Sequence, residues 1–318
     1  MFKKILVPLD GSPLSEAILT RLYRGLQSEA EVRLLTVIPA AKDHESGWHL
    51  QAFERAREYL CGVRDSLALS GIRADFEIRS GEAAEQILEF ARTWRPSLLA
   101  MSTHGRSGLS RAVRGSTAER VLRRSRHPLL LANPRGLEPG QPAEDARFRK
   151  VLVPLDGSNS SARILPLVRA MAKSNQSEVV LQYVDAACPI LAQGGAFFFT
   201  EPPVEIDPGI GSGGDAGREA LEPLGETLAR AGIPCRIRVD RNVPATAILD
   251  AAAEEKADLV AMTTHGRSGI SRWAYGSVAE GVLRRSCVPL LIQRTAGLGA
   301  EPAGVRRRRR KAHASNAE

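Results

Sequence analysis

A duplicated segment constrains what this chain can fold into more than any other feature of its sequence. Residues 101–131 read MSTHGRSGLSRAVRGSTAERVLRRSRHPLLL, and residues 262–292 repeat this segment with 21 of 31 positions identical. Residues 4–12 (KILVPLDGS) and residues 150–158 (KVLVPLDGS) match at eight of nine positions. The copies lie 146 residues apart at the first segment and 161 apart at the later one, so the second half has a net gain of 15 residues. The sequence therefore predicts two domains with one fold.

Short apolar runs alternate with segments of helical spacing in the first half. We predict strands at residues 5–9, 31–37, 74–79, 98–101 and 129–131, and helices at 12–28, 48–70, 83–93 and 116–124. Strands that alternate with helices favour an open parallel sheet covered on both faces. Because crossovers are right-handed, the loops that follow the strands lie along one edge of the sheet, where ligands bind. The loops that contain Asp10 and Gly105 can therefore face one pocket.

The second half repeats this order with one interruption. We predict its strands at residues 151–155, 179–184, near 236–239 and 259–262, and its helices at 162–173, 218–231 and 245–254. Residues 186–216 show no period, which indicates either a variable insertion or, given the Phe197–Phe199 cluster, a lid or subunit contact. The expected organisation is a first domain at 1–135, a linker at 136–148, a second domain at 149–295 and a disordered basic tail at 296–318.

Charge is concentrated at the end of the chain. The formal net charge is +8, and Arg306–Lys311 supply six of these charges, so the predicted domains are close to neutral. The tail is interpreted as a solvated segment, or as a contact for nucleic acid or an acidic surface.

Other features concern the cellular compartment. The apolar segment near the N-terminus is too short for a signal peptide, and no apolar run approaches the ~18 residues of a membrane span. The four cysteines are scattered without a CxxC pair. We therefore expect reduced thiols, no transmembrane segment and a cytoplasmic location.

The repeated loop carries residue types suited to a phosphate group. Gly105 and Gly115 let the backbone approach phosphate oxygens or adopt positive φ. Ser116 is expected at the N-cap of the following helix, where its hydroxyl and unpaired N–H groups suit an anion, and Arg106 adds charge-assisted bonds. A Gly-Ser helix start needs no ligand by itself, but two matching copies of an extended loop favour a nucleotide site.

These loops and the architecture resemble the universal stress protein family over nearly the whole chain except the linker and tail. The family's nucleotide-binding pattern is G-x2-G-x9-G-[S/T]. Its later part matches Gly105, Gly115 and Ser116, and again Gly266, Gly276 and Ser277, whereas Ser102 and Thr263 replace its first glycine. The resemblance implies two tandem flavodoxin-like (Rossmann-like) five-stranded parallel-sheet sandwiches, each with one ATP.

The resemblance also implies roles for single residues. Asp10 and Asp156 would lie near the ribose or near Mg²⁺ carried by the nucleotide, and main-chain groups of Val37 and Val184 would read the adenine edge. From the residues alone, an Asp-Gly pair is also an ordinary turn, and both valines are also ordinary buried strand residues. The predicted ATP-binding residues are the strand ends, glycine loops and helix starts of both halves: Pro8, Leu9, Asp10, Gly11, Ser12, Val37, Met101, Ser102, His104, Gly105, Arg106, Gly108, Gly115, Ser116, Thr117, Pro154, Leu155, Asp156, Gly157, Ser158, Val184, Met262, Thr263, His265, Gly266, Arg267, Gly269, Gly276, Ser277 and Val278.

Three classes of function remain open on the sequence. His104 and His265 do not form an HxGH pattern, and neither a P-loop nor a catalytic triad is legible. The leading hypothesis is a stress-response protein regulated by ATP, with at most weak hydrolysis and no catalytic residue assigned. The rivals are an ATPase or nucleotidyl transferase that uses the same pocket, and a nucleotide-free interaction module. The resemblance further implies pairing through the last strands, Leu129–Leu131 and Leu290–Ile292, within the chain and with a homodimer as a further step.

Overall fold

The structure, a computed structural model, describes residues 2–23, 30–40, 46–103, 116–133, 147–185, 213–264 and 276–294. The first half contains β1 (Lys4–Pro8), α1 (Pro13–Tyr23), β2 (Glu31–Ile38), α2 (Ser46–Leu69), β3 (Ala74–Ser80), α3 (Ala83–Trp94), β4 (Leu98–Ser102), α4 (Ser116–Arg124) and β5 (Leu129–Ala132). The second contains β6 (Lys150–Leu155), α5 (Asn159–Ala162), α6 (Leu165–Asn175), β7 (Glu178–Asp185), α7 (Gly213–Arg230), β8 (Cys235–Arg241), α8 (Pro244–Glu254), β9 (Leu259–Thr263), α9 (Ser277–Arg285) and β10 (Leu290–Gln293). Among these described helices, none has the length and apolar character to span a bilayer.

The second half departs from the predicted helices in two places. The single helix predicted at 162–173 is wrong, because α5 ends at Ala162 and α6 begins at Leu165. Pro166 stands in the first turn of α6, where its missing N–H group is tolerated, but it could not continue an existing helix without breaking a hydrogen bond. Helix α7 begins at Gly213, so residues 213–216, assigned to the insertion from the sequence, are helical.

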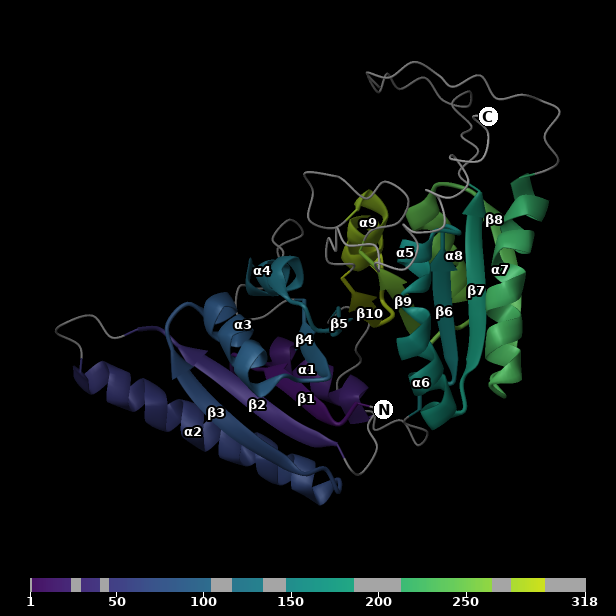
Figure 1. The fold of residues 1–318 in the computed structure, drawn as a ribbon. Coiled ribbons are helices and arrows are strands. Elements are labelled where there is room, and N and C mark those ends of the chain that lie inside the picture. Colours follow the sequence, from purple (N-terminus) through teal and green to yellow (C-terminus); the bar gives the residue numbers. More distant parts are fainter. Residues whose placement is uncertain are drawn as a thin grey trace, which may run out of the picture.

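All described strands join one ten-stranded sheet in the order β3-β2-β1-β4-β5-β10-β9-β6-β7-β8. Each half is parallel, and its order corresponds to 3-2-1-4-5, as in Rossmann-type sheets. The halves meet where β5 and β10 pair antiparallel, with Leu130 opposite Leu291 (Figure 1). The chain therefore forms two five-stranded sheets that are hydrogen-bonded into one.

Two apolar layers cover this sheet, and each layer runs through both halves. Alternating side chains of β1 point to opposite faces, so that Ile5 and Val7 belong to one layer and Leu6 to the other. Helices α1, α2, α6 and α7 contribute to the first layer, and α3, α4, α8 and α9 to the second. Because Leu130 and Leu291 both lie in the first layer, burial at the junction stabilises the two halves together.

The cysteines of the described residues are not cross-linked. Cys61, Cys235 and Cys287 are free thiols. Burial, with a smaller contribution from Glu178, raises the pKa of the Cys235 thiol to about 11, so this thiol stays protonated near neutral pH. Such a thiol is a poor nucleophile, which is consistent with a structural role.

The C-terminal ends of α3 and α8 contact the sheet through different kinds of interaction. In the first half, Phe90 stacks on Trp94 with ring centroids 6.0 Å apart, and the Arg33 guanidinium lies 5.6 Å from the Trp94 ring. In the second half, Glu255 occupies the position equivalent to Trp94 and forms ion pairs with Arg236 and Arg238. Equivalent positions near the ends of α3 and α8 therefore contact the sheet through an aromatic ring in one half and through an ion-pair network in the other.

This network makes the second half sensitive to acid. Hydrogen bonds from Arg236 lower the pKa of Glu178 and of Glu255 below the usual 4.5. Burial alone would raise the pKa of Asp240, but hydrogen bonds from Arg238 and Gln182 outweigh it and lower that pKa below 3.8. Carboxylates whose pKa is lowered by folding stabilise the native state above their unfolded pKa, and this stabilisation is lost as pH falls through the folded pKa.

We therefore expect the urea midpoint to fall between pH 5 and pH 3, with hydrogen exchange in β8 rising earlier than in β3. Glu255→Gln should lower the midpoint at pH 7 and flatten its dependence on pH. Asp65→Asn, which removes an exposed carboxylate paired with Arg64, should leave both unchanged. The same pH dependence in wild type and Glu255→Gln would contradict this assignment.

Candidate functional site

The structure places the described part of the predicted ATP-binding set at one edge of each half-sheet. In the first half these residues follow β1, lie in β2 and β4, and begin α4: Pro8, Leu9, Asp10, Gly11, Ser12, Val37, Met101, Ser102, Ser116 and Thr117. In the second half they are Pro154, Leu155, Asp156, Gly157, Ser158, Val184, Met262, Thr263, Gly276, Ser277 and Val278. His104, Gly105, Arg106, Gly108, Gly115, His265, Gly266, Arg267 and Gly269 lie outside the described residues.

The strand order brings the two segments of each half together. Strand β1 pairs parallel with β4, and β6 pairs in the same way with β9. After β1 the chain continues toward β2 on one side, and after β4 it continues toward β5 on the other. Asp10 and Ser102 therefore stand at the ends of adjacent strands, at the point where the chain runs to opposite sides of the sheet. Open parallel sheets bind their ligands at this point.

The aspartates that follow the first strands organise the adjacent turns. One carboxylate oxygen of Asp10 accepts hydrogen bonds from the Ser12 backbone N–H at 3.0 Å and from its hydroxyl at 2.6 Å. Gly11 has φ 80°, which an L side chain adopts with strain. The Ser12 hydroxyl oxygen accepts from Ser15 N–H at 3.2 Å, so Ser12 caps α1 and Asp10 does not.

The second half repeats this geometry. Asp156 accepts from Ser158 N–H at 3.0 Å, Gly157 has φ 77°, and Ser158 caps α5 by accepting from Ser161 N–H at 3.1 Å. Equal geometry in both halves shows that the turn is built by local interactions. In each half these hydrogen bonds use one carboxylate oxygen and hold the carboxylate at the sheet edge.

The hydroxyl residues at the end of β4 are directed to the neighbouring strand. Ser102 and Thr103 are buried, and each hydroxyl donates to the Ala132 carbonyl of β5 at 3.3 Å. The Thr103 backbone N–H donates to the same carbonyl at 2.9 Å. The side chain that replaces the first motif glycine is therefore accommodated between strands β4 and β5.

The helices after these strands begin close to the sheet edge. Helix α4 begins at Ser116 and α9 at Ser277, and Gly276 is the N-cap of α9, which corrects the expectation that the serine occupies the cap. Gly276 itself has no side chain that could cap α9. A Cβ atom added at Gly276 would lie 3.2 Å from the Thr264 carbonyl oxygen, so glycine allows the helix start to approach the end of β9. The N–H groups of a first helical turn have no partner within the helix and are suited to an anion.

The remaining predicted positions are less distinctive. Val37 and Val184 are partly buried in β2 and β7 and pack against the second apolar layer. Their side chains are those of ordinary strand residues. Any contact with an adenine ring would therefore use the main chain at the sheet edge.

One neighbour of the Asp10 turn had no signal in the sequence. Tyr59, a half-buried residue of α2, lies near Ser15, Glu16 and Asp10. Burial, followed by the nearby carboxylates of Glu16 and Asp10, raises its pKa well above the usual 10, so its phenol stays protonated. The helical spacing of α2 predicted only a packed face, because aromatic core residues occupy such positions without any site. The buried Thr103 and Thr264 were likewise missed, although their position directly after buried strands could have indicated them.

Metal ligands are not grouped in the part of the chain that the structure describes: no cluster of three or more His, Cys, Asp or Glu residues there could hold an ion. Mg²⁺ commonly takes one or two carboxylates plus phosphate oxygens, and the role of Asp10 and Asp156 toward such an ion stays a prediction.

Known proteins agree with this architecture. A universal stress protein of Methanocaldococcus jannaschii is 32% identical over 139 residues, which span 41% of this chain and 82% of that protein. Universal stress protein YxiE of Bacillus subtilis is 29% identical over 147 residues, which span 46% of this chain and 99% of that protein. The crystal structure of a universal stress protein from Archaeoglobus fulgidus covers 92% of this chain and 99% of its own, with a TM-score of 0.70 and 23% identity.

The model of the universal stress protein family matches the chain twice, at residues 1–133 and at residues 147–294. Both matches end close to the last strands, β5 and β10. They contain both copies of the strand, loop and helix segment described above. The chain therefore belongs to the universal stress protein family, as a tandem member with two domains.

Proposed function

We propose that each domain binds one nucleotide, ATP by preference, at the edge where β1 meets β4 and where β6 meets β9. The observation that carries this proposal is the approach of the α9 start to the neighbouring strand end, where a Cβ added at Gly276 would lie 3.2 Å from the Thr264 carbonyl oxygen. Beside it stands the Asp156 turn, whose carboxylate is held in place by Ser158. Anion-binding N–H groups and an acidic residue together suit a nucleotide that carries Mg²⁺.

The regulatory role follows from the way the domains are joined. A nucleotide that binds one conformation or assembly state better than another shifts the population toward that state. We propose that ATP acts in this way in a cytoplasmic stress-response protein, with domain pairing through β5 and β10 within the chain and further association into a homodimer. The glycine loops at 104–115 and 265–275 supply the phosphate contacts in this proposal.

The direct test is a measurement of nucleotide content and stoichiometry. The full chain is purified without added nucleotide, denatured, and its supernatant separated by ion-pair chromatography. Nucleotide-free protein is then titrated with ATP and Mg²⁺ by calorimetry. The expected result is close to two ATP per chain. Absence of both bound nucleotide and binding heat would overturn the proposal and favour a nucleotide-free interaction module, whereas ADP that accumulates with time would favour an ATPase.

Variants of the two aspartates assign the sites. Asp10→Asn keeps the oxygen that accepts from Ser12 but removes the charge, so the turn should persist. We expect affinity at that site to fall about tenfold with Mg²⁺ and to be unchanged in EDTA, because a carboxylate that contacts the cation acts only when the cation is present. Asp156→Asn should affect the other site in the same way.

The matched control is Asp65→Asn, which removes one exposed carboxylate from α2. It should leave both affinities unchanged. Equal losses with Mg²⁺ and in EDTA would assign the aspartates to the ribose, and no loss in either condition would remove them from the site.

A further inference from the structure

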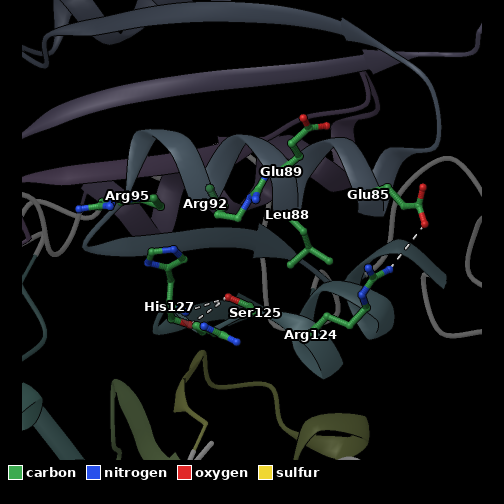
Figure 2. Close-up of a pocket in the computed structure, with 11 residues that line it drawn as sticks. Glu85, Leu88, Glu89, Arg92, Arg95, Arg124, Ser125 and His127 are labelled. Atoms are coloured by element: carbon green, nitrogen blue, oxygen red, sulfur yellow. Dashed lines mark hydrogen bonds and ion pairs between the residues drawn. The ribbon is translucent and has the colours of Figure 1, made fainter.

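A second cavity lies away from the proposed ATP sites. It has a volume of about 950 Å³ and is lined by the C-terminal half of α3, the end of α4 and the segments that lead into β4 and β5. Figure 2 shows Leu88 on α3 facing the side of the cavity that carries Ser125 and His127. These segments precede β4 and β5, so the cavity lies at the amino ends of the strands, opposite the Asp10 edge. Its size is within the range of small-molecule sites.

Its floor and rim differ in chemistry. Leu88, Ala91 and Pro96 supply apolar surface, and Ala91 and Pro96 are buried. The rim carries four guanidinium groups and two carboxylates, a formal charge of +2: Arg92, Arg95, Arg124, Arg126, Glu85 and Glu89. Helices α3 and α4 both end here, and their dipoles offset roughly one of these charges. A positive excess therefore remains over an apolar floor.

Three of the four arginines retain their donors for a ligand. Arg124 pairs with Glu85 at 3.6 Å (Figure 2). Arg92, Arg95 and Arg126 are exposed and form no ion pair with the residues that the structure describes. Guanidinium groups bind phosphate and carboxylate oxygens in a bidentate manner, which favours oxyanions over simple ions.

A histidine lines the same cavity. His127 is half-buried, and burial lowers its pKa despite hydrogen bonds to the backbone of Pro96 and Ala91. Its ring is therefore neutral near pH 7 and presents a flat surface beside the arginines.

The second domain keeps only part of this set of residues, because Lys256 stands at the position of Arg95 and Arg285 at that of Arg124. With the offset of 161 residues between the domains, Ala253 stands at the position of Arg92, Cys287 at that of Arg126 and Val288 at that of His127. The fold therefore does not require cations or an imidazole at these positions. Compensation of helix dipoles accounts for the cations that both domains keep near these helix ends, and it leaves Arg92 and Arg126 as additions of the first domain.

We propose that this cavity of the first domain binds a small organic oxyanion: a phosphate or carboxylate group held by Arg92, Arg95 and Arg126, with an apolar or aromatic part on Leu88 and Pro96. Such a ligand would bind independently of ATP, because the two sites lie at opposite ends of the same strands. A ligand in this cavity would thus act on the first domain and not on the second.

The test follows His127 by NMR in the full chain, with ¹³C-labelled histidine and with His127→Val to assign its signal. The protein is titrated with phenyl phosphate, with benzoate and with inorganic phosphate. We expect a saturable shift of the His127 signal, tighter binding of phenyl phosphate than of inorganic phosphate, and at least tenfold weaker binding in Arg92→Ala/Arg126→Ala. Comparison of phenyl phosphate with benzoate distinguishes phosphate from carboxylate ligands.

Arg169→Ala/Arg230→Ala removes the same charge from exposed positions on α6 and α7 of the second domain and should leave the titration unchanged. The proposal is overturned if the His127 signal does not move with any probe. It is also overturned if both double variants weaken the shift equally, because the effect would then report net charge and not this cavity.

Discussion

Replacing Leu291 by Lys is expected to lower the free energy of unfolding by at least about 4 kcal/mol. Leu291 is 1% exposed and lies opposite Leu130, which is 3% exposed, in the antiparallel pairing of β5 with β10. The change removes the burial of a whole leucine side chain, which contributes about 1.5–3 kcal/mol. It also places an amine in the apolar layer, where the amine must either lose its proton or be hydrated by water that enters the layer. Because the apolar layer is continuous across the junction, the loss should reach both domains.

Calorimetry and hydrogen exchange measure this effect. The wild type should unfold in one main transition, and Leu291→Lys should unfold at lower temperature, with amides of β5 and β10 exchanging first. Leu69→Lys makes the same chemical change at a leucine that is 92% exposed and should have almost no effect. Equal behaviour of the two variants would mean that the β5–β10 junction does not couple the domains.

Replacing Gly217 by Ala is expected to destabilise the second domain by about 1–3 kcal/mol, as overpacking of a tight contact does. Gly217 is buried in α7, and an added Cβ would lie 2.3 Å from Cδ1 and 2.8 Å from Cγ of Tyr183 in β7. The clash involves the root of an aromatic ring, so the ring or the helix must move. Tyr183 precedes Val184, and the movement should therefore also weaken ATP binding at the second site.

Gly225 of the same helix provides the control. A Cβ atom there would lie 3.6 Å from Ile237 and 3.9 Å from Cys235, which is ordinary contact. Gly225→Ala should therefore be neutral or stabilise by up to about 1 kcal/mol, through the better helix propensity of alanine. Urea unfolding of both variants gives the comparison. If Gly217→Ala matched Gly225→Ala, the close approach of α7 to Tyr183 would be refuted.

The candidate site shows which structural features local sequence patterns predict. The helix predicted at 116–124 is found as α4 with the same bounds, and the Asp-Gly turns form as both Asp10 and Asp156 indicated. Both depend on residues within a few positions of one another, which periodicity and turn chemistry record. The glycine loops at 104–115 and 265–275 remain predictions, because they lie outside the described residues.

Contacts between distant segments were not predicted by local patterns. In the first domain the cavity with Arg92 and His127 forms where two helices end together, and in the second a buried Gln182 donates to Asp240 at 2.7 Å across strands. No periodicity records such pairs, because their members are tens of residues apart and meet only through packing. The copies share one local pattern and yet differ here residue by residue.

The sequence by itself determined that two α/β domains follow each other, where their strands and most of their helices lie (α5, α6 and the start of α7 excepted), and which strand ends could form a site. These properties depend on repeated motifs and on the local spacing of apolar residues. Only the tertiary structure decided the register in which β5 pairs with β10, with Leu130 opposite Leu291, the close approach of α9 to Thr264 at Gly276, and the cationic cavity beside α3 and α4 of the first domain. These features are stabilised by burial of residues that lie far apart in the chain. Such burial exists only once the whole fold has formed.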